Sequence, residues 1–380
     1  MQNIEHVSLS DGWMAVVYRE WDFPADVVEV WERLSADYGD TGIFISYGWF
    51  EKWWRAFGKA GEMLVVVIMK NSKPKGIFPC LLKHGFKEIS ICSLTNDHSC
   101  HYDFLIDAVE KDLTLLNFIK LIHLQYPNTS MHFDYMIASS PNIRTLTQLL
   151  RNNRIPFHQY MSPSAPWMKL EDDTKLLLAQ LPGRLRNTIQ RGRKKAEKRG
   201  RVDFEVFTSG EHLDEAVNIM FDVEYKGWKG RNGTAIKCDS EVERFYRSYA
   251  SVAMNKGQLL IPLLTIDNIP VAADYCLGSG NTIFLLKPGY DESYSHISPG
   301  NLLRSCIFDY LVKSGYSLYN FLGACEPWKM EWTQKTHEYV WIEIFPKSVS
   351  GWGHYAVKYG WKELIKKSRL MRRYISGRRK

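Results

Sequence analysis

Apolar and polar residues alternate along the first half of the chain in segments of helical and strand-like spacing. Apolar residues recur every three or four positions over 47–57, and Ser46 stands where an N-cap belongs. Strand-like runs over 63–70 and 76–83 flank a turn, which predicts a hairpin. The remaining elements predicted in this half are strands at 87–92 and 102–106 and a helix at 113–124.

The second half repeats this order more clearly. Three strand-like runs at 258–266, 270–277 and 282–287 are separated by the short turns Asp267–Asn268 and 278–281, which predicts an antiparallel meander. Ser240 and Glu243 have the spacing of a capping box ahead of a helix. The other elements predicted here are a strand at 202–208, helices at 213–223, 242–255 and 301–314, and strands at 317–321 and 339–345.

Length and composition agree with a folded chain of more than one domain. The chain has 380 residues, of which 45% are hydrophobic and 24% charged. Its seven cysteines are scattered and form no CxxC pair, which favours reduced thiols in a cytoplasmic protein. The longest apolar runs, 63–69 and 259–266, are far shorter than a membrane-spanning helix requires.

Positive charge is concentrated in two segments. The segments 184–201 and 362–380 each hold nine basic residues and one acid, so the rest of the chain is acidic although the total is +7. The tail 351–380, which includes the second segment, carries interspersed aromatic and aliphatic residues, which predicts a basic amphipathic helix. The charge of 362–380 favours a peripheral position of this helix on an anionic membrane. The first predicts a helix with an anionic partner.

The segment 288–303 (PGYDESYSHISPGNLL) is the most informative motif. Ser298, Pro299, Gly300 and Asn301 end a loop and open a helix directly after the meander. The start of a helix offers free backbone N–H groups and the positive end of the dipole, and glycine lets a phosphate approach the backbone. An ordinary helix-initiating turn with proline in the first position is the alternative.

The sequence resembles the CelD-like and Fem-related acetyltransferases of the GNAT superfamily, the former associated with cellulose and polysaccharide biosynthesis. The resemblance covers roughly 44–345 and departs from the family at Asn320, where an aspartate is frequent. The residues that carry it are Ser46, Trp49, Trp54, Asn96, Asp103, Leu185, Arg186, Arg191, Lys195, Gly200, Tyr225, Trp228, Ala272, Ala273, Gly289–Asp291, Ser298–Gly300, 319–323, Glu326 and Lys329.

This resemblance implies an α/β (α+β) fold of two tandem GNAT-like lobes, each a mixed, largely antiparallel sheet flanked by helices. The expected divisions are an N-terminal lobe (1–175), a basic interlobe helix (176–201), a C-terminal lobe that binds the acyl donor (202–347) and a basic tail (348–380). It also implies acyl-CoA as co-substrate, with the pyrophosphate at Ser298, Pro299, Gly300 and Asn301.

Transfer from a thioester needs a base for the acceptor and an acid for the leaving thiolate. Tyr290 and Tyr319, together with Tyr294, are candidates for the acid, and packing tyrosines are the alternative. Asp103, His101 and Glu326 are candidates for the base. In an extended segment His101 and Asp103 would both face the acceptor cleft, whereas a polar loop is the alternative.

The segment 96–103 (NDHSCHYD) allows two further interpretations, which are disfavoured. His98, Cys100 and His101 lack the paired spacing of a structural zinc site, so no metal is expected. Cys100 and His101 are adjacent and would point to opposite faces of a strand, so a nucleophile–base pair is not expected either. Transfer is therefore expected to be direct.

Trp228 and Lys329 are candidates for acceptor binding, with a core ring and an exposed ion pair as the alternatives. The acceptor is expected to be an amine or hydroxyl of a lipid or sugar precursor. For the basic segment 184–201, an acyl carrier protein, tRNA, coenzyme A phosphates and an anionic bilayer remain open as partners.

The sequence therefore predicts a cytoplasmic acyltransferase, with a peripheral position on the inner membrane face as an extension. A Fem-like transferase that uses aminoacyl-tRNA and a non-catalytic, membrane-docked binding protein are the alternatives.

Overall fold

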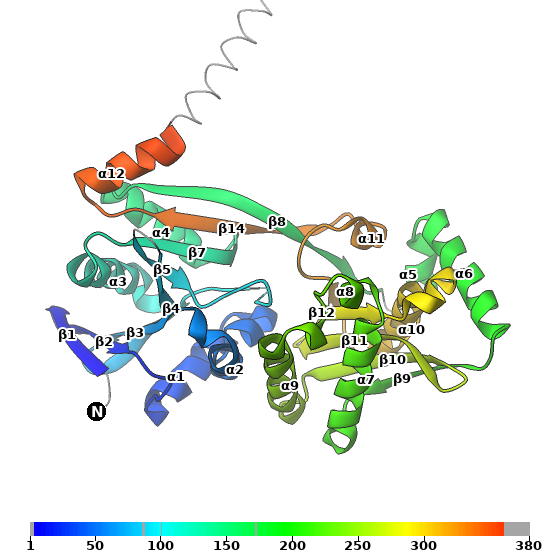
Figure 1. Ribbon diagram of the computed structural model, residues 1–380. Helices are drawn as coiled ribbons and strands as arrows, with labels where there is room; N and C mark the ends of the chain where they lie inside the picture. Colours follow the sequence, from blue (N-terminus) through cyan, green and yellow to red (C-terminus); the bar gives the residue numbers. More distant parts are fainter. Residues whose placement is uncertain (1–3, 86–87, 100, 172, 361–380) are drawn as a thin grey trace, which may run out of the picture. The chain divides into compact units, whose positions relative to one another are not determined.

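The chain forms two compact units, shown in the computed structural model of Figure 1. The structure describes residues 4–85, 88–99, 101–171 and 173–360. Unit 1 consists of residues 1–34, 58–162 and 339–380, and unit 2 of residues 35–57 and 163–338. Strands β8 (Phe157–Lys169) and β14 (Thr336–Ile344) each continue from one unit into the other. The division into 1–175, 176–201, 202–347 and 348–380 stays a prediction.

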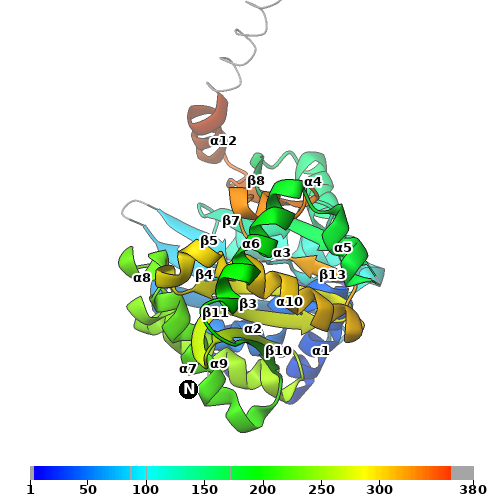
Figure 2. The ribbon, with the colours of Figure 1, turned by 90° about the vertical axis from the view of Figure 1, so that its right-hand side faces the viewer.

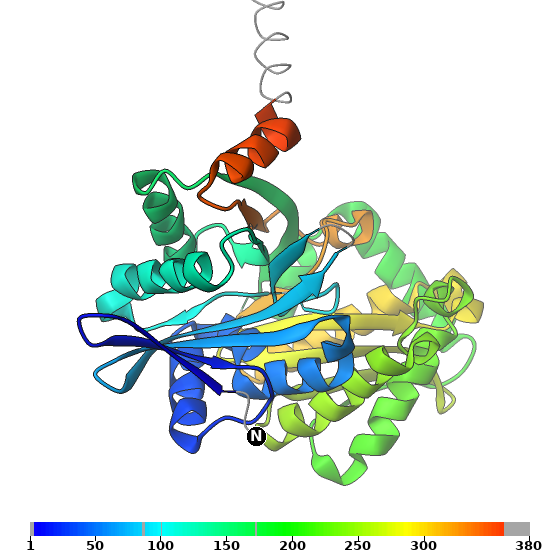
Figure 3. The same ribbon diagram turned by 60° about the vertical axis from the view of Figure 1, so that its left-hand side comes forward.

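Unit 1 is a mostly antiparallel sheet covered by helices (Figure 3). From β1 to β14 the strand order is β1-β2-β3-β4-β5-β7-β14, and the neighbours are antiparallel except β5 and β7. The remaining strands and α-helices are β1 (Ile4–Ser10), β2 (Trp13–Tyr18), β3 (Glu62–Lys70), β4 (Lys73–His84), β5 (Ile89–Ser93), β6 (Leu105–Ile106), β7 (Ser130–Ile137), α1 (Ala25–Ala36), α3 (Lys111–Gln125), α4 (Pro141–Asn152) and α12 (Val349–Tyr355).

The predicted hairpin in this unit is confirmed as β3 and β4. The β3 residues from Met63 to Ile68 are buried without alternation, as expected for a strand covered on both faces. The predicted strand at 102–106 was too long, because only Leu105–Ile106 pairs, with β4.

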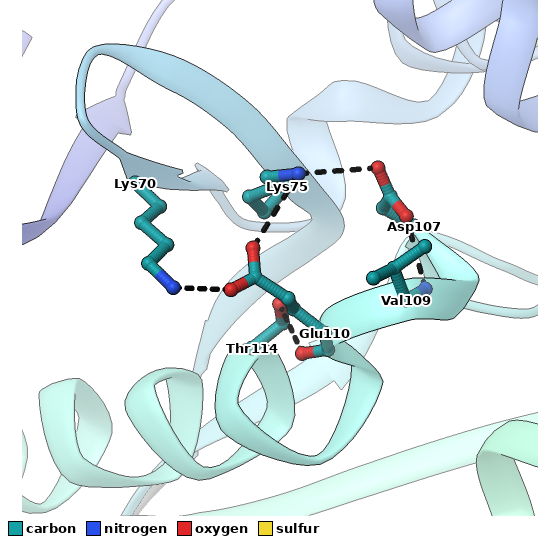
Figure 4. Close-up of polar contacts among 6 residues, drawn as sticks. All are labelled: Lys70, Lys75, Asp107, Val109, Glu110 and Thr114. Carbon is teal, nitrogen blue, oxygen red and sulfur yellow. Dashed lines mark hydrogen bonds and ion pairs between the residues drawn. The ribbon is translucent and has the colours of Figure 1, made fainter.

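A cluster of charges fixes the β3–β4 hairpin to the start of α3 (Figure 4). The Lys75 Nζ atom lies 3.4 Å from Asp107 Oδ2 and 3.4 Å from Glu110 Oε2, and Lys70 also pairs with Glu110. The Val109 N–H and Lys75 lower the pKa of Asp107, and the two lysines lower that of Glu110. Acidic side chains at the first turn are also favoured by the helix dipole.

Unit 2 repeats this plan, with strand order β8-β13-β12-β11-β10-β9. Its neighbours are antiparallel except β12 and β13. Its other elements are η1 (Gly39–Ile45), α2 (Tyr47–Phe57), α5 (Thr174–Gln180), α6 (Gly183–Glu197), β9 (Val202–Phe207), α7 (Leu213–Tyr225), α8 (Trp228–Arg231), α9 (Ser240–Asn255), β10 (Leu259–Ile266), β11 (Ile269–Ser279), β12 (Thr282–Tyr290), η6 (Glu292–Ile297), α10 (Pro299–Lys313), β13 (Leu318–Asn320) and α11 (Pro327–Met330).

Helices cover both faces of this sheet (Figure 2). On one face, apolar residues of α5, α6 and α10 form a common core with β10, β11 and β12. On the other, α2 packs on α9, where the Trp49 ring meets those of Phe245 and Tyr249 at 5.1 and 4.7 Å. In each unit one parallel pair of strands, β5 with β7 and β12 with β13, follows antiparallel strands and is joined through a helix. The predicted tandem fold of mixed, largely antiparallel sheets flanked by helices is thus confirmed.

The helix predicted at 47–57 is confirmed as α2, and the Ser46 hydroxyl accepts the Trp49 N–H at 3.3 Å. The capping box before α9 was wrong by one residue. Asp239 is the N-cap, because its carboxylate accepts the N–H groups of Glu241 and Val242. The basic amphipathic tail predicted at 348–380 is helical in its described part, which consists of α12 and the π-helical turn Ala356–Gly360. Its most basic segment, 362–380, lies outside the described residues.

Candidate functional site

Strands β12 and β13 separate after a short parallel contact. Only Thr282, Ile283 and Phe284 of β12 pair with β13, although β12 continues to Tyr290. Tyr275 of β11 pairs with Lys287 and Cys276 pairs with Leu285, so Leu286 forms a β-bulge. A bulge bends a strand and increases its twist. Beyond it, the β12 edge facing away from β11 has no partner strand in the described part of the chain.

The chain then leads from β12 into the start of α10. Ser298 adopts the left-handed conformation (φ 54°), which is uncommon for a residue with a side chain. Pro299 has no N–H, and the N–H groups of Asn301 and Leu302 are bonded to the Ser298 carbonyl. The Gly300 N–H is bonded to no described residue, so it remains for a ligand at the positive end of the helix dipole.

Tyr290 and the segment before α8 lie next to this helix start. A Cβ placed on Gly300 would lie 4.0 Å from the Tyr290 ring, and one on Gly227 would lie 2.9 Å from the Tyr290 carbonyl. Gly227 is followed by Trp228, whose exposed fraction is 42%. The Lys229 Nζ atom donates to the Pro288 carbonyl at 2.9 Å. The end of β12 thus lies beside an exposed aromatic ring.

A buried charged pair supports the first turn of α10. The Arg304 Nη1 atom donates to the Gly300 carbonyl at 2.8 Å, and Nη2 lies 3.8 Å from the Asp274 carboxylate. The Arg304 guanidinium also lies 4.5 Å from the Trp328 ring centroid. Burial raises the pKa of Asp274 although Arg304 opposes this shift. Arg304 therefore connects α10 with β11 and with α11.

Tyr319 lies in the same buried cluster. Its hydroxyl is close to Cys276, Asp274 and Arg304, but no described group forms a hydrogen bond of good geometry with it. The side chain is fully buried, and burial raises its pKa well above the usual value. A hydroxyl in this state is a poor proton donor to a solvent-accessible leaving group.

Glu326 and Lys329 hold the loop that follows β13. The Lys329 Nζ atom donates to the Leu322 carbonyl at 2.8 Å and lies 3.2 Å from Glu326 Oε2. Glu326 is half-exposed and accepts the Trp328 indole N–H at 2.9 Å. Lys329 is 7% exposed, so its charge is directed to this loop.

The structure places His101 and Asp103 in unit 1, where both are buried. No described group forms a hydrogen bond with either His101 ring nitrogen, and burial lowers the pKa of His101 to about 3. The Asp103 carboxylate accepts from the Ser140 hydroxyl at 2.5 Å and from the Asn142 amide at 2.8 Å. Burial outweighs these bonds and raises its pKa to about 6. Cys100 lies outside the described residues.

The structure brings Tyr290, Ser298, Pro299, Gly300 and Asn301 together at the end of β12. Sequence reasoning missed Asp274 and Arg304, which hold this region in place. The signal was present, because each is a charged residue within an otherwise apolar element, VAADYCL and LLRSCIF. Among the described residues, no group of His, Cys, Asp and Glu could hold a metal ion. None of the described helices is long and apolar enough to cross a membrane.

Residues 183–330, all within unit 2, match the profile of the family described as "Acetyltransferase (GNAT) domain". The chain contains a GNAT-superfamily acetyltransferase domain. This domain is that of a transferase, and it includes the separated strands, the bulge and the start of α10. A sequence comparison with curated proteins gives no match.

Solved structures share the fold of the GNAT-containing chain. FemX is 12% identical with a TM-score of 0.53, covering 79% of this chain and 91% of its own. A conserved protein of unknown function from Bacteroides thetaiotaomicron is 11% identical, with a TM-score of 0.51 and coverage of 91% and 100%. The C-terminal domain of a proposed lysylphosphatidylglycerol synthetase from Agrobacterium fabrum is 10% identical, with a TM-score of 0.50 and coverage of 84% and 91%. At such low sequence identities, the structural similarity shows the fold alone.

Proposed function

We propose that the protein is an acyltransferase that moves an acyl group from a thioester to an amine or hydroxyl acceptor. The observation that carries this proposal is the separation of β12 from β13 at the Leu286 bulge, beside the unbonded Gly300 N–H. A pantetheine arm has amide groups along its length, and it pairs with a free strand edge much as an added strand does. Its phosphate then reaches the start of α10.

The residues around this region have separate roles in the proposed reaction. Ser298, Pro299, Gly300 and Asn301 hold the donor phosphate at the start of α10. Tyr290 is partly buried beside Gly300, and its hydroxyl donates the proton to the leaving thiolate. Glu326 orients the acceptor amine or hydroxyl and accepts its proton as it attacks the thioester directly, while the carbon–sulfur bond breaks and the thiolate takes the proton of Tyr290.

The acceptor is a lipid or sugar precursor in this proposal. Tyr225 and Trp228 are 52% and 42% exposed at the α7–α8 corner, next to the end of β12. Amphipathic rings of this kind bind apolar chains or sugar faces. The proposal extends to a CelD-like place in polysaccharide or lipid biosynthesis, in the cytoplasm at the inner membrane face, because the scattered cysteines favour reduced thiols and the segment 362–380 is strongly basic.

A thermal-shift series with coenzyme A, acetyl-CoA and octanoyl-CoA tests the proposal. A ligand at about 100 times its dissociation constant stabilises the folded state by about 2.7 kcal/mol. For a unit of this size, that raises the melting temperature by about 5–10 °C. Gly300→Leu abolishes the shift, because the side chain fills the space between Tyr290 and Arg304. Gly210→Leu is the matched control, since a Cβ there meets only Met254 at 3.8 Å.

The outcomes separate the competing functions. A shift with acyl thioesters that Gly300→Leu removes supports transfer from a thioester. No shift with any thioester, combined with stabilisation by aminoacyl-tRNA, contradicts it in favour of a Fem-like transferase. Stabilisation only by anionic lipid or polysaccharide precursors indicates a non-catalytic binding protein.

A further inference from the structure

Helix α6 packs against the end of η6, directly before the start of α10 where the donor phosphate is proposed to bind. Its buried residues are Leu185, Ile189, Gly192 and Ala196, which face the core formed with α10. A Cβ on Gly192 would lie 2.2 Å from the Ile297 carbonyl, immediately before α10. This close approach permits only glycine. The exposed side of α6 is therefore held at a defined place beside the start of α10 (Figure 2).

The exposed side of α6 and its C-terminal extension is strongly basic. All nine basic side chains between positions 184 and 201 are exposed. Arg193 pairs with Glu197 and Arg201 with Asp203, while Lys195 and Arg199 contact His296. The others form no hydrogen bond or ion pair with the described residues; these are Arg184, Arg186, Arg191, Lys194 and Lys198.

Four of the nine cations form one row, which we call the basic row: Arg184, Arg191, Lys195 and Lys198. Of these four, Lys195 alone has a partner among the described residues, the His296 carbonyl. Their spacings of seven, four and three residues bring them to the same flank of the helix. The row is about 21 Å long at the helical rise. Like charges in a row repel each other, and an anionic surface as long as the row relieves this repulsion. A single diphosphate is too short to contact the whole basic row.

The backbone near α10 suits one phosphate better than several. In η6 the Ser293 N–H is taken by the Asp291 carboxylate, and the N–H groups of Tyr294 and Ser298 by backbone carbonyls. The nearby cations Lys226 and Arg231 are paired with the carboxylates of Asp291 and Glu292, so neither is left for a further phosphate. Among the described N–H groups at this helix start, that of Gly300 remains unbonded. Coenzyme A has a diphosphate and a further phosphate, whereas a carrier-bound pantetheine arm has a single phosphodiester.

We propose that the basic row docks an acidic carrier protein, which presents its acyl thioester on a phosphopantetheine arm. This inference rests on the proposed function and names the form of its donor. The arm enters along the free edge of β12 while the acidic face of the carrier covers α6. Nucleic acid fits less well, because α6 contains no aromatic residue on which a base could stack.

Direct binding to the full chain tests the docking surface. The probe is an acyl carrier protein in its apo, holo and octanoyl forms, titrated by calorimetry at low and physiological salt. Arg191→Glu combined with Lys198→Glu weakens binding by about tenfold or more, with a smaller salt dependence. The matched control is Arg244→Glu combined with Arg144→Glu, two exposed helical cations outside α6, which changes the affinity less than about twofold.

The holo and octanoyl forms bind more tightly than the apo form if the arm enters the site. Binding that the α6 reversal leaves unchanged would overturn the inference, as would no carrier binding alongside α6-dependent binding of duplex RNA or anionic vesicles. Octanoyl-CoA separates this failure from failure of the proposed function. If it stabilises the wild type and the α6 double variant equally, the transferase proposal stands without the carrier; if no thioester binds, both fall.

Discussion

Asp103 has a structural role in unit 1, and the variant Asp103→Asn tests it. The carboxylate is 1% exposed and accepts the Phe104 N–H, the Asn142 amide and the Ser140 hydroxyl at 2.7, 2.8 and 2.5 Å. Ser140 and Asn142 stand at the start of α4. An asparagine keeps this geometry, because its oxygen accepts from Phe104 and Asn142 while its amide donates to the Ser140 oxygen.

The size of the effect follows from the pKa of Asp103, which burial raises from 3.8 to about 6. A rise of roughly two pH units corresponds to about 3 kcal/mol. The folded state therefore binds the proton more tightly than the unfolded state does. This contribution to stability is fully present below about pH 4 and is lost as the pH rises to about 6. Asp103→Asn has a neutral side chain and does not lose it.

The free energy of opening of unit 1 is the quantity to measure. Hydrogen exchange followed by mass spectrometry, in peptides that cover β7 and α4, gives this value for both proteins. The free energy of opening of Asp103→Asn, measured relative to that of the wild type, increases by about 3 kcal/mol as the pH is raised from about 4 to 7. A difference that does not change with pH would refute the reasoning, because Asp103 would then be ionised in the folded state throughout.

Three other substitutions test the packing described above. Gly192→Leu forces α6 away from the Ile297 carbonyl and lowers stability by about 1–3 kcal/mol, seen as a lower melting temperature by calorimetry, whereas Gly183→Ala leaves it unchanged. Lys75→Met removes both ion pairs of that ammonium and destabilises unit 1 in urea titrations. This difference in stability disappears in acid, where Asp107 and Glu110 become protonated below their lowered pKa values. A difference that persists in acid would contradict the prediction. Tyr319→Phe keeps the packed ring and removes a buried hydroxyl without a good partner, so stability in urea is unchanged or higher by about 1 kcal/mol; a clear decrease would show that the hydroxyl is bonded.

Local periodicity predicted the helices and strands that have one apolar face or are bounded by clear turns. The helix at 47–57 has one apolar face, and the β10–β12 meander has clear turns, so both were found with boundaries close to those of the structure. The helices α1 and α4 and the strands β1, β2, β7 and β8 were not predicted. The segment around Asp103 was ambiguous for another reason. Its polar residues suggest a surface loop, whereas the hydrogen bonds from Ser140 and Asn142, nearly forty positions away, allow them to be buried.

The candidate site depends more on backbone than on side chains, which explains why only a short motif was visible in the sequence. The bulge at Leu286 and the unbonded N–H of Gly300 are backbone features, and many residues other than leucine would permit the first. Side chains enter mainly as supports. The Arg304 guanidinium fixes the Gly300 carbonyl and is itself held by Asp274 and Trp328. A buried arginine–aspartate pair is costly unless geometry compensates, so its presence under this helix turn indicates a requirement for position rather than for stability.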